Sequence, residues 1–503
     1  MKAWLLLLAS VSVFPAFAQK KKVDLHAVAL AHAVHSTDEL YNLLSIPNVA
    51  LVASDIESNV LWCEEAFKKR GFTTQRLTTP ATPLLLAERK FKSAVKTVLI
   101  YLQIDGQPVN ASQWDQESPW KPVLKEKDAA GNWREIPYTR LKEKIDPEWR
   151  IFARSVADAK GPAMAFLAAL DAMKAIQAEP TYNIKVIMDF EEELGSPHLP
   201  EAVTRYKKEL SADMLIIYDG PRHVSNEPTL SFGARGICEI TITTFGPRVP
   251  VHSGNYGNYT PNPALRLAQL LASMKDEEGR VTIPGFYEGV LLTDAEKKIL
   301  KQVPDNESEI QKFLGIATPD QVGGSFQESL QYPTLNIRGM DALFVGRESR
   351  TLIPATATAE LDIRLVTGSD ANRLTDLVKK HILDRGYYLV KSEPTEEERM
   401  KYGKIAAFRS HVSYGAFQTP FDSETGLWLQ KAMIHAFGKE PIRLRTSGGS
   451  IPISPFVITL GIPAVMVPMV NADNNQHAEN ENLRVGNYVD GVKAYLAILL
   501  EKL

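Results

Sequence analysis

The sequence predicts an α/β protein with a mostly parallel sheet, into which a smaller α+β domain is inserted. Apolar runs of strand length alternate with helical stretches in the first half of the chain, as they do in parallel sheets. The strand-like runs are Thr97–Leu102, Ile184–Met188 and Met214–Tyr218. The helical stretches are Gly161–Ala178 and Leu199–Leu210.

A different pattern begins near Pro228. Two segments, Ala234–Thr244 and Thr358–Val366, alternate apolar and polar residues as strands with one exposed face do. Each is followed by a helical pattern, over Pro263–Met274 and Asn372–Asp384 respectively. This order predicts a small ferredoxin-like α+β domain.

The first pattern returns after about Phe408. We expect a helix over Glu424–Phe437, a buried strand over Ala464–Val470 and a terminal helix from Gly486. The chain therefore divides into a main α/β domain and an insertion. The expected bounds are 23–226 with 407–503 for the first, and 227–406 for the second.

Composition excludes some classes of function. The 503 residues are 44% hydrophobic and 23% charged, with a formal net charge of −3, so no basic surface for nucleic acid or an anionic membrane is expected. The two cysteines, Cys63 and Cys238, form no C-x-x-C motif. We expect two separate buried thiols.

The first residues are typical of a secretory signal peptide. Lys2 precedes the apolar run Ala3–Phe17, and small residues stand at Ala16 and Ala18. We therefore predict cleavage after Ala18, export to the periplasm or the medium, and no membrane contact afterwards. The alternative is a membrane anchor, but the run is shorter than a span of ~20 residues.

Acidic residues follow the ends of successive predicted strands. Asp105, Glu192 with Glu193, and Asp219 each come shortly after an apolar run, and Asp158 precedes a helix. Ligands bind at this edge of open α/β sheets. Several carboxylates that converge there would repel one another unless cations lay among them. The pattern therefore predicts a divalent metal centre, to which His477 would add a nitrogen ligand.

Five short motifs make the prediction more specific. They are D-x-K-G at Asp158–Gly161, E-E-x-G-S at Glu192–Ser196, His252–Gly254, S-G-G-S-I-P at Ser447–Pro452 and H-A-E-N-E at His477–Glu481. Because these motifs occur in this order, the chain resembles the two-zinc metallopeptidase superfamily with an inserted dimerisation domain. That superfamily includes carnosinases and cytosolic non-specific dipeptidases, carboxypeptidase G, succinyl-diaminopimelate desuccinylase and aminoacylases. The resemblance is collinear from about residue 25 to the end.

The resemblance implies a role for each metal-site residue. Asp158 would bridge two metal ions, with Glu193 and His477 completing one site. Asp219 and the residue at position 103 would complete the other. Glu192 would be the general base that takes a proton from the attacking water.

The resemblance also implies roles for residues around the metals. His252 would reach across a homodimer to steady the developing oxyanion, and Asp105 would orient its neighbours. The groups expected to hold a substrate carboxylate are Arg364, Gly448, Gly449 and Ser450.

The chain departs from the family pattern at one metal ligand, where a histidine is replaced by Gln103. A glutamine offers only a neutral carbonyl oxygen, which suits harder cations better than zinc. Three outcomes are open: a metal pair with one weak site, a single-metal enzyme, or a catalytically inactive relative. We expect one or two Zn²⁺ per subunit, with Mn²⁺ or Co²⁺ as alternatives at the weaker site.

The predicted function is hydrolysis of dipeptides or short peptides that have a free C-terminal carboxylate. Two alternatives remain from the sequence. One is an N-acyl or N-carbamoyl amino-acid amidohydrolase, which would use the same metals. The other is a non-catalytic peptide-binding protein with a vestigial site.

Overall fold

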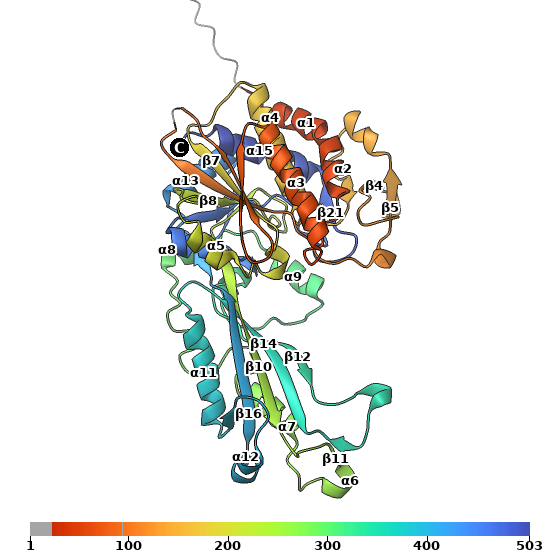
Figure 1. The fold of residues 1–503 in the computed structure, drawn as a ribbon, viewed down its shortest axis with the longest axis vertical. Helices are drawn as coiled ribbons and strands as arrows, with labels where there is room; N and C mark the ends of the chain where they lie inside the picture. Colours follow the sequence, from red (N-terminus) through yellow and green to blue (C-terminus); the bar gives the residue numbers. More distant parts are fainter. Residues whose placement is uncertain (1–22, 93) are drawn as a thin grey trace, which may run out of the picture.

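The computed structural model describes residues 23–92 and 94–503, which form two bodies arranged along the long axis (Figure 1). The upper body is a broad α/β unit. The lower one is an extended sheet with helices along one side. The predicted fold class is thereby confirmed, with both the α/β unit and the inserted α+β unit present.

The large sheet has eight strands. In spatial order they are β1 (Thr73–Leu77), β2 (Leu84–Arg89), β7 (Asn183–Asp189), β3 (Thr97–Gln103), β8 (Met214–Ile217), β20 (Ala464–Met466), β9 (Thr229–Ser231) and β18 (Ile442–Leu444). The four central strands pair in parallel. Antiparallel pairs join β1, β2 and β7 on one side and β20 with β9 on the other, so the whole sheet is mixed.

Helices cover both faces of this sheet. They are α1 (Leu25–His35), α2 (Thr37–Leu44), α3 (Ala53–Lys69), α4 (Lys160–Ala175), α5 (Leu199–Arg205), α13 (Glu424–Phe437), α14 (Ser454–Leu460) and α15 (Val485–Leu500). Successive side chains of a strand point to opposite faces. On β3, Ile100 and Leu102 therefore join the cluster that contains α4 and α15, whereas Leu99 and Tyr101 join the cluster with α5 and α14.

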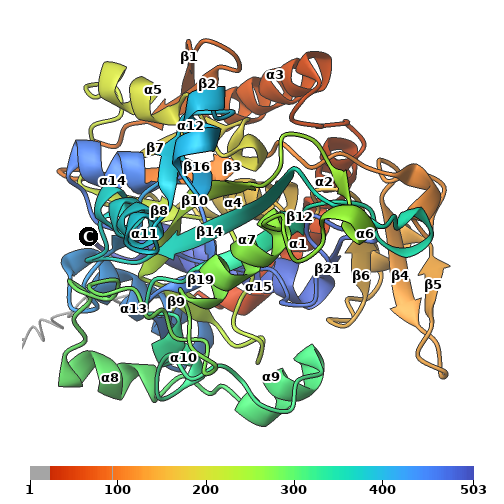
Figure 2. The same cartoon turned by 90° about the horizontal axis from the view of Figure 1, so that it is seen from below.

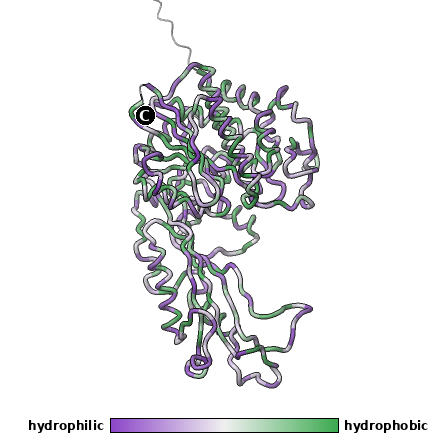
Figure 3. Tube along the Cα trace, in the orientation of Figure 1, coloured by the Kyte–Doolittle hydropathy of each residue, from purple (hydrophilic) through white to green (hydrophobic). Residues whose placement is uncertain are grey.

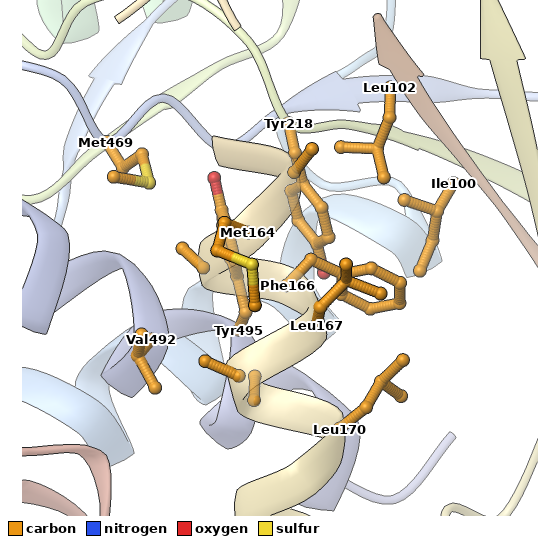
Figure 4. Packing of buried hydrophobic residues seen from close by; sticks show 14 of the residues in the cluster. Ile100, Leu102, Met164, Phe166, Leu167, Leu170, Tyr218, Met469, Val492 and Tyr495 are labelled. Carbon is orange, nitrogen blue, oxygen red and sulfur yellow. The ribbon is translucent and has the colours of Figure 1, made fainter. Parts of the chain in front are cut away.

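Helix α4 is the centre of the larger cluster. It is apolar on nearly all sides, with Met164, Phe166 and Leu167 each at most 2% exposed, which is typical of a helix enclosed by other elements. Figure 4 shows these residues against Tyr218 and Tyr495, whose rings stack with their centroids 3.8 Å apart. The loop that carries Asp158 therefore leads directly into a helix that is packed tightly in the core.

A smaller, four-stranded sheet lies beside α2, and two of its strands flank predicted site residues in the sequence. Its order is β21 (Asn482–Arg484), β6 (Arg150–Phe152), β4 (Val123–Lys127) and β5 (Trp133–Ile136). The pairing of β21 with β6 matters most for function. It brings the segment before Asp158 beside the segment after His477, although the two are more than 300 residues apart.

The extended body is built on β10 (Gly233–Phe245), which pairs antiparallel with β14 (Thr356–Leu365) and β16 (Ile405–Tyr414). Its edges are β12 (Asn336–Asp341) and β15 (Tyr388–Val390). Buried and half-buried residues alternate along β10 because α7 (Pro263–Ala272) and α11 (Ala371–Asp384) pack on one face only (Figure 2). Hydrophobic and hydrophilic positions are correspondingly interleaved along this body (Figure 3).

Shorter elements complete the chain. At the far end of the extended body are β11 (Val251–His252), α6 (Ser253–Tyr256), β13 (Leu352–Ile353) and α12 (Glu396–Lys401). Near the junction of the bodies are α8 (Asp294–Leu300), α9 (Glu307–Leu314), α10 (Phe326–Ser329), β17 (Phe417–Gln418) and β19 (Ser447–Ser450). An ion pair between Glu296 and Arg445, 2.8 Å apart, ties α8 to the segment before β19.

We propose new bounds for the inserted domain, based on which sheet each strand belongs to. Strand β9 belongs to the large sheet, whereas β16 belongs to the small one. We therefore place the start of the insertion at about Gly233 and its end at about Tyr414. Cys63 and Cys238 are both free and buried, as predicted.

The D-x-K-G motif supplies the acidic residue Asp158 and also two residues that pack in the core. Lys160 is fully buried, donates to the backbone oxygens of Leu43 and Ile46, and has its pKa lowered to about 7 by burial. A Cβ at Gly161 would lie 2.1 Å from the Val156 oxygen and 2.8 Å from Leu483 Cδ2. Only glycine fits where the loop before α4 crosses β21.

Gly161→Ala is therefore expected to destabilise the fold by about 2 kcal/mol or more, because backbone must shift to admit the methyl group. Chemical denaturation measures the change. Gly403→Ala is the matched control, since a Cβ there meets nothing within 4 Å. Equal stability of the two variants would contradict this account of the motif.

Candidate active site

The predicted acidic residues meet at the carboxyl edge of the large sheet. Gln103 is the last residue of β3, Glu192 and Glu193 form a 3₁₀ turn shortly after β7, and Asp219 follows β8. Parallel pairing of β7, β3 and β8 aligns these ends. Asp158 comes from the neighbouring loop before α4.

Three of the predicted ligands form a compact cluster. Ligand atoms of Asp158, Glu193 and His477 lie within 4.8 Å of one another. His477 Nε2 is 3.0 Å from Asp158 Oδ2 and 3.1 Å from Glu193 Oε2, and these two hydrogen bonds raise the pKa of His477 to about 10. Two carboxylates and an imidazole are a ligand set that zinc takes. These residues therefore fit a divalent cation.

The second predicted set is arranged differently. Gln103 Nε2 donates to Asp158 Oδ1 at 2.7 Å, and the Gln103 amide lies close enough to Asp219 to oppose part of the rise in the pKa of that carboxyl. Gln103 Oε1 is buried, and no hydrogen-bond partner for it lies within residues 23–92 and 94–503. Asp158 Oδ1 thus faces an N–H donor where a second cation would need a ligand, and this arrangement does not fit a second cation.

Glu192 lies among the other acids of the site. Burial raises its pKa well above the usual range, and so do the neighbouring Asp158 and Asp219. Burial, and then Asp158, also raise the pKa of Asp219. A carboxylate whose pKa is raised toward neutrality is suited to accept and return a proton.

Asp105 contacts the segment that carries Glu193. It is 1% exposed, and its Oδ2 accepts a hydrogen bond from the Glu193 backbone N–H at 2.9 Å. Burial, and then Asp189, raise the pKa of Asp105. Asp105, which was predicted to orient its neighbours, thus contacts the backbone of the predicted ligand Glu193.

Glu481, for which no site role was predicted from the sequence, holds the loop that carries Asp158. Both of its oxygens accept two N–H groups each: Oε1 from the backbones of Ala157 (2.9 Å) and Asp158 (3.0 Å), Oε2 from the backbone of Ser155 (2.8 Å) and from Arg154 Nη1 (2.9 Å). Glu481 is 1% exposed. Its place at the end of the H-A-E-N-E motif was the available signal.

Two further side chains were also overlooked. Gln107 Nε2 donates to Glu193 Oε2 at 2.8 Å, and Gln476 Nε2 lies 3.3 Å from Asp158 Oδ2. Both are only half-buried and both lie on loops. Gln476 is adjacent to His477, but a lone glutamine carries no pattern that distinguishes it in sequence.

The loops of the site hold residues in left-handed conformations. Ser155 has a φ of 61° and His477 a φ of 64°, and Asn475 and Asn480 are also left-handed. Such conformations cost roughly 1–3 kcal/mol each for residues other than glycine and persist only where the surroundings determine them. The Glu481 contacts and the β6–β21 pairing supply those surroundings.

The predicted carboxylate-binding residues form a separate group along β10. Arg364 on β14 is opposite Ile237, and β19, which contains Gly448, Gly449 and Ser450, pairs with residues 234 and 235. Arg364 Nε is 3.3 Å from Asp362 Oδ2. The structure therefore collects these residues at the root of the extended body and not in the three-ligand cluster.

His252 is not brought to the metal ligands within one chain. It lies on β11, at the far end of the extended body (Figure 1), where it is exposed and caps α6 by accepting the Gly254 N–H at 3.0 Å.

The fold and the three-ligand cluster together define a metallohydrolase that has an α/β body and an inserted α+β body. The profile of Peptidase family M20/M25/M40 matches residues 101–501, and the chain belongs to that family. It is accordingly a metal-dependent peptidase, which confirms the family and the enzyme class expected from the sequence.

The chain is also similar to named peptidases in sequence and to a solved peptidase structure in fold. The chain is 28% identical to the Beta-Ala-His dipeptidase of Mus musculus, covering 84% of this chain and 80% of the relative. It is 25% identical to the Cys-Gly metallodipeptidase dug1 of Schizosaccharomyces pombe, covering 96% of each. The M20 family metallo-carboxypeptidase Sso-CP2 of Sulfolobus solfataricus superposes with a TM-score of 0.76 at 26% identity, covering 92% of this chain and 98% of that one.

The comparison with the named relatives contradicts the predicted export. Because the chain is similar to the Cys-Gly and Beta-Ala-His dipeptidases, the prediction of a periplasmic or secreted protein is wrong. A short apolar run after a basic residue is a compositional signal only. That run, Ala3–Phe17, and the predicted cleavage after Ala18 lie outside the described residues. Across 23–92 and 94–503, no helix is long and apolar enough to cross a membrane.

Replacing Glu481 by Gln is expected to weaken metal binding about 10- to 100-fold, the usual cost of losing a group that orients a metal ligand. In either orientation the amide would set its NH₂ against a backbone N–H group, and it would leave the buried Arg154 without a charged partner. Zinc titration of the metal-free protein measures this. Glu479→Gln, two residues earlier on the same loop, is the control, and similar zinc affinities for both variants would contradict the assignment.

Proposed function

We propose that this protein hydrolyses dipeptides or short peptides with a free C-terminal carboxylate, using zinc at the Asp158–Glu193–His477 cluster. The observation that carries the proposal is this cluster with Glu192 beside it, at the carboxyl edge of the sheet. The names of the relatives support it, since they describe a Beta-Ala-His dipeptidase and a Cys-Gly metallodipeptidase.

The residues of the site divide the work of hydrolysis. Asp158, Glu193 and His477 would hold the cation, which when bound polarises the scissile carbonyl and lowers the pKa of water. Glu192 accepts the proton of the attacking water on its carboxylate and returns it to the departing amine nitrogen. Asp105 and Glu481 keep Glu193 and Asp158 in place through backbone N–H groups.

The group along β10 is proposed to receive the substrate's C-terminal carboxylate. A guanidinium such as that of Arg364 binds carboxylates in a bidentate manner, and backbone N–H groups of Gly448 and Gly449 can add further donors. This requirement for a free carboxylate would restrict the enzyme to the ends of peptides.

We also propose that the protein is a homodimer in which His252 serves the partner's site. Within one chain His252 lies at the opposite end of the extended body from the junction with the large body, so it needs a second subunit to approach a metal cluster. The edge strand β12 is exposed at every position and presents Ile337 (45% exposed) and Met340 (53% exposed). Such an open apolar edge is suited to pairing with another chain.

Metal-stripped protein is expected to regain turnover of a dipeptide pool when it is reloaded with zinc, manganese or cobalt. Glu192→Gln should lower kcat/KM about 10²- to 10⁴-fold, because the proton acceptor is lost, and should leave the zinc content unchanged. Amine release and elemental analysis measure the two quantities. If no metal restores peptide turnover, the dipeptidase proposal fails, and N-acyl amino acids and then simple peptide binding become the readings to test.

Subunit complementation tests the role of His252. His252→Ala and Glu192→Gln homodimers are each expected to be inactive. A heterodimer of the two has one intact site, so it should recover about half of the wild-type turnover if the histidine acts on its partner. Co-expression with two affinity tags isolates the heterodimer. A heterodimer as inactive as both parents, or a fully active His252→Ala homodimer, would refute the proposal.

A further inference from the structure

We propose that the Gln103 amide takes the place of a second metal ion, so that each subunit holds one cation, at Asp158, Glu193 and His477. This inference rests on the proposed function only in assuming that the cluster binds metal.

The two oxygens of Asp158 have different partners. Oδ2 faces His477 Nε2 at 3.0 Å, on the side of the three-ligand cluster. Oδ1 accepts the Gln103 N–H at 2.7 Å. A carboxylate that bridged two cations would need a ligand partner beside each oxygen. Oδ2 faces an imidazole nitrogen, which can serve as a metal ligand, whereas Oδ1 faces an amide N–H, which cannot.

The amide nitrogen itself is no substitute for a ligand. It carries two N–H donors and no lone pair available to a metal. One donor serves Asp158, and the amide also lies near Asp219, so the NH₂ group stands beside the same two carboxylates that a second cation would join. It donates to Asp158 without adding positive charge.

Gln103 has little freedom to adopt another arrangement. It is the last residue of β3, in register with Asp189 of β7, and is 2% exposed. Turning the amide over would put Oε1 against Asp158 Oδ1, acceptor against acceptor. In the observed orientation Asp158 receives a donor, and no hydrogen-bond partner of the buried Oε1 lies among the described residues.

The other amides of the site differ in this respect. Gln107 and Gln476 also donate to ligand carboxylates, but on the side of the three-ligand cluster. They are half-buried on loops, so they can turn aside when a cation binds. Gln103 is 2% exposed at the end of a central strand, so its side chain has no solvent beside it into which to turn.

Metal stoichiometry tests the proposal directly. Metal-free full-length protein is titrated with Zn²⁺ by calorimetry, and the bound metal is counted by elemental analysis. We expect one ion per subunit for the wild type and two for Gln103→His, which restores an imidazole ligand. Loading with Mn²⁺ should give an isolated-ion electron paramagnetic resonance signal in the wild type and a spin-coupled pair in Gln103→His.

Two further variants keep the test decisive. Gln107→His is the matched control, because it adds an imidazole to the same acidic edge at a half-buried loop position, and it should still bind one ion. Gln103→Glu has nearly the shape of glutamine but replaces the N–H donors by an oxygen ligand, so it should bind two ions even if Gln103→His fails to fold.

The outcomes separate this inference from the proposed function. Two ions in the wild type, or one ion in both Gln103 variants, would overturn the inference whatever the activity. One ion in the wild type and two in either Gln103 variant would support it, even if no peptide is turned over and the dipeptidase proposal falls.

Discussion

The convergence of carboxylates at one edge of a parallel sheet is the constraint on which the rest of this structure depends. Asp158, Glu192, Glu193 and Asp219 would repel one another strongly in a buried setting without compensating charge or donors. The imidazole of His477 and the amide of Gln103 supply that compensation from opposite sides of Asp158. The edge therefore tolerates a high density of acids, which is what metal-assisted hydrolysis requires.

The loops that hold this edge are themselves held by buried groups. Glu481 gathers four N–H groups of the segment before α4, and the β6–β21 pairing sets that segment beside the loop that carries His477. Beneath them, α4 packs against α15 in the core of the large body (Figure 4). Site geometry is in this way coupled to core packing, so substitutions far from the ligands can alter metal binding.

Elements with strong periodicity were predictable from sequence. The strand Thr97–Leu102 and the helix Glu424–Phe437 agree with β3 and α13 within a residue, because apolar spacing directly reflects burial. Shorter or weaker segments were less predictable. The run Ala464–Val470 forms a strand only through Met466, and β9 joins the large sheet through partners that no local pattern reveals.

The sequence by itself determined the fold class, the family and the chemical character of the site, because hydrophobic spacing and short motifs are local properties of the chain. It also showed that position 103 lacks a histidine. Only the tertiary structure decided what Gln103 contacts, how Glu481 anchors the Asp158 loop and that His252 lies far from its own site. These facts depend on distances between segments hundreds of residues apart, and such distances exist only after the chain has packed.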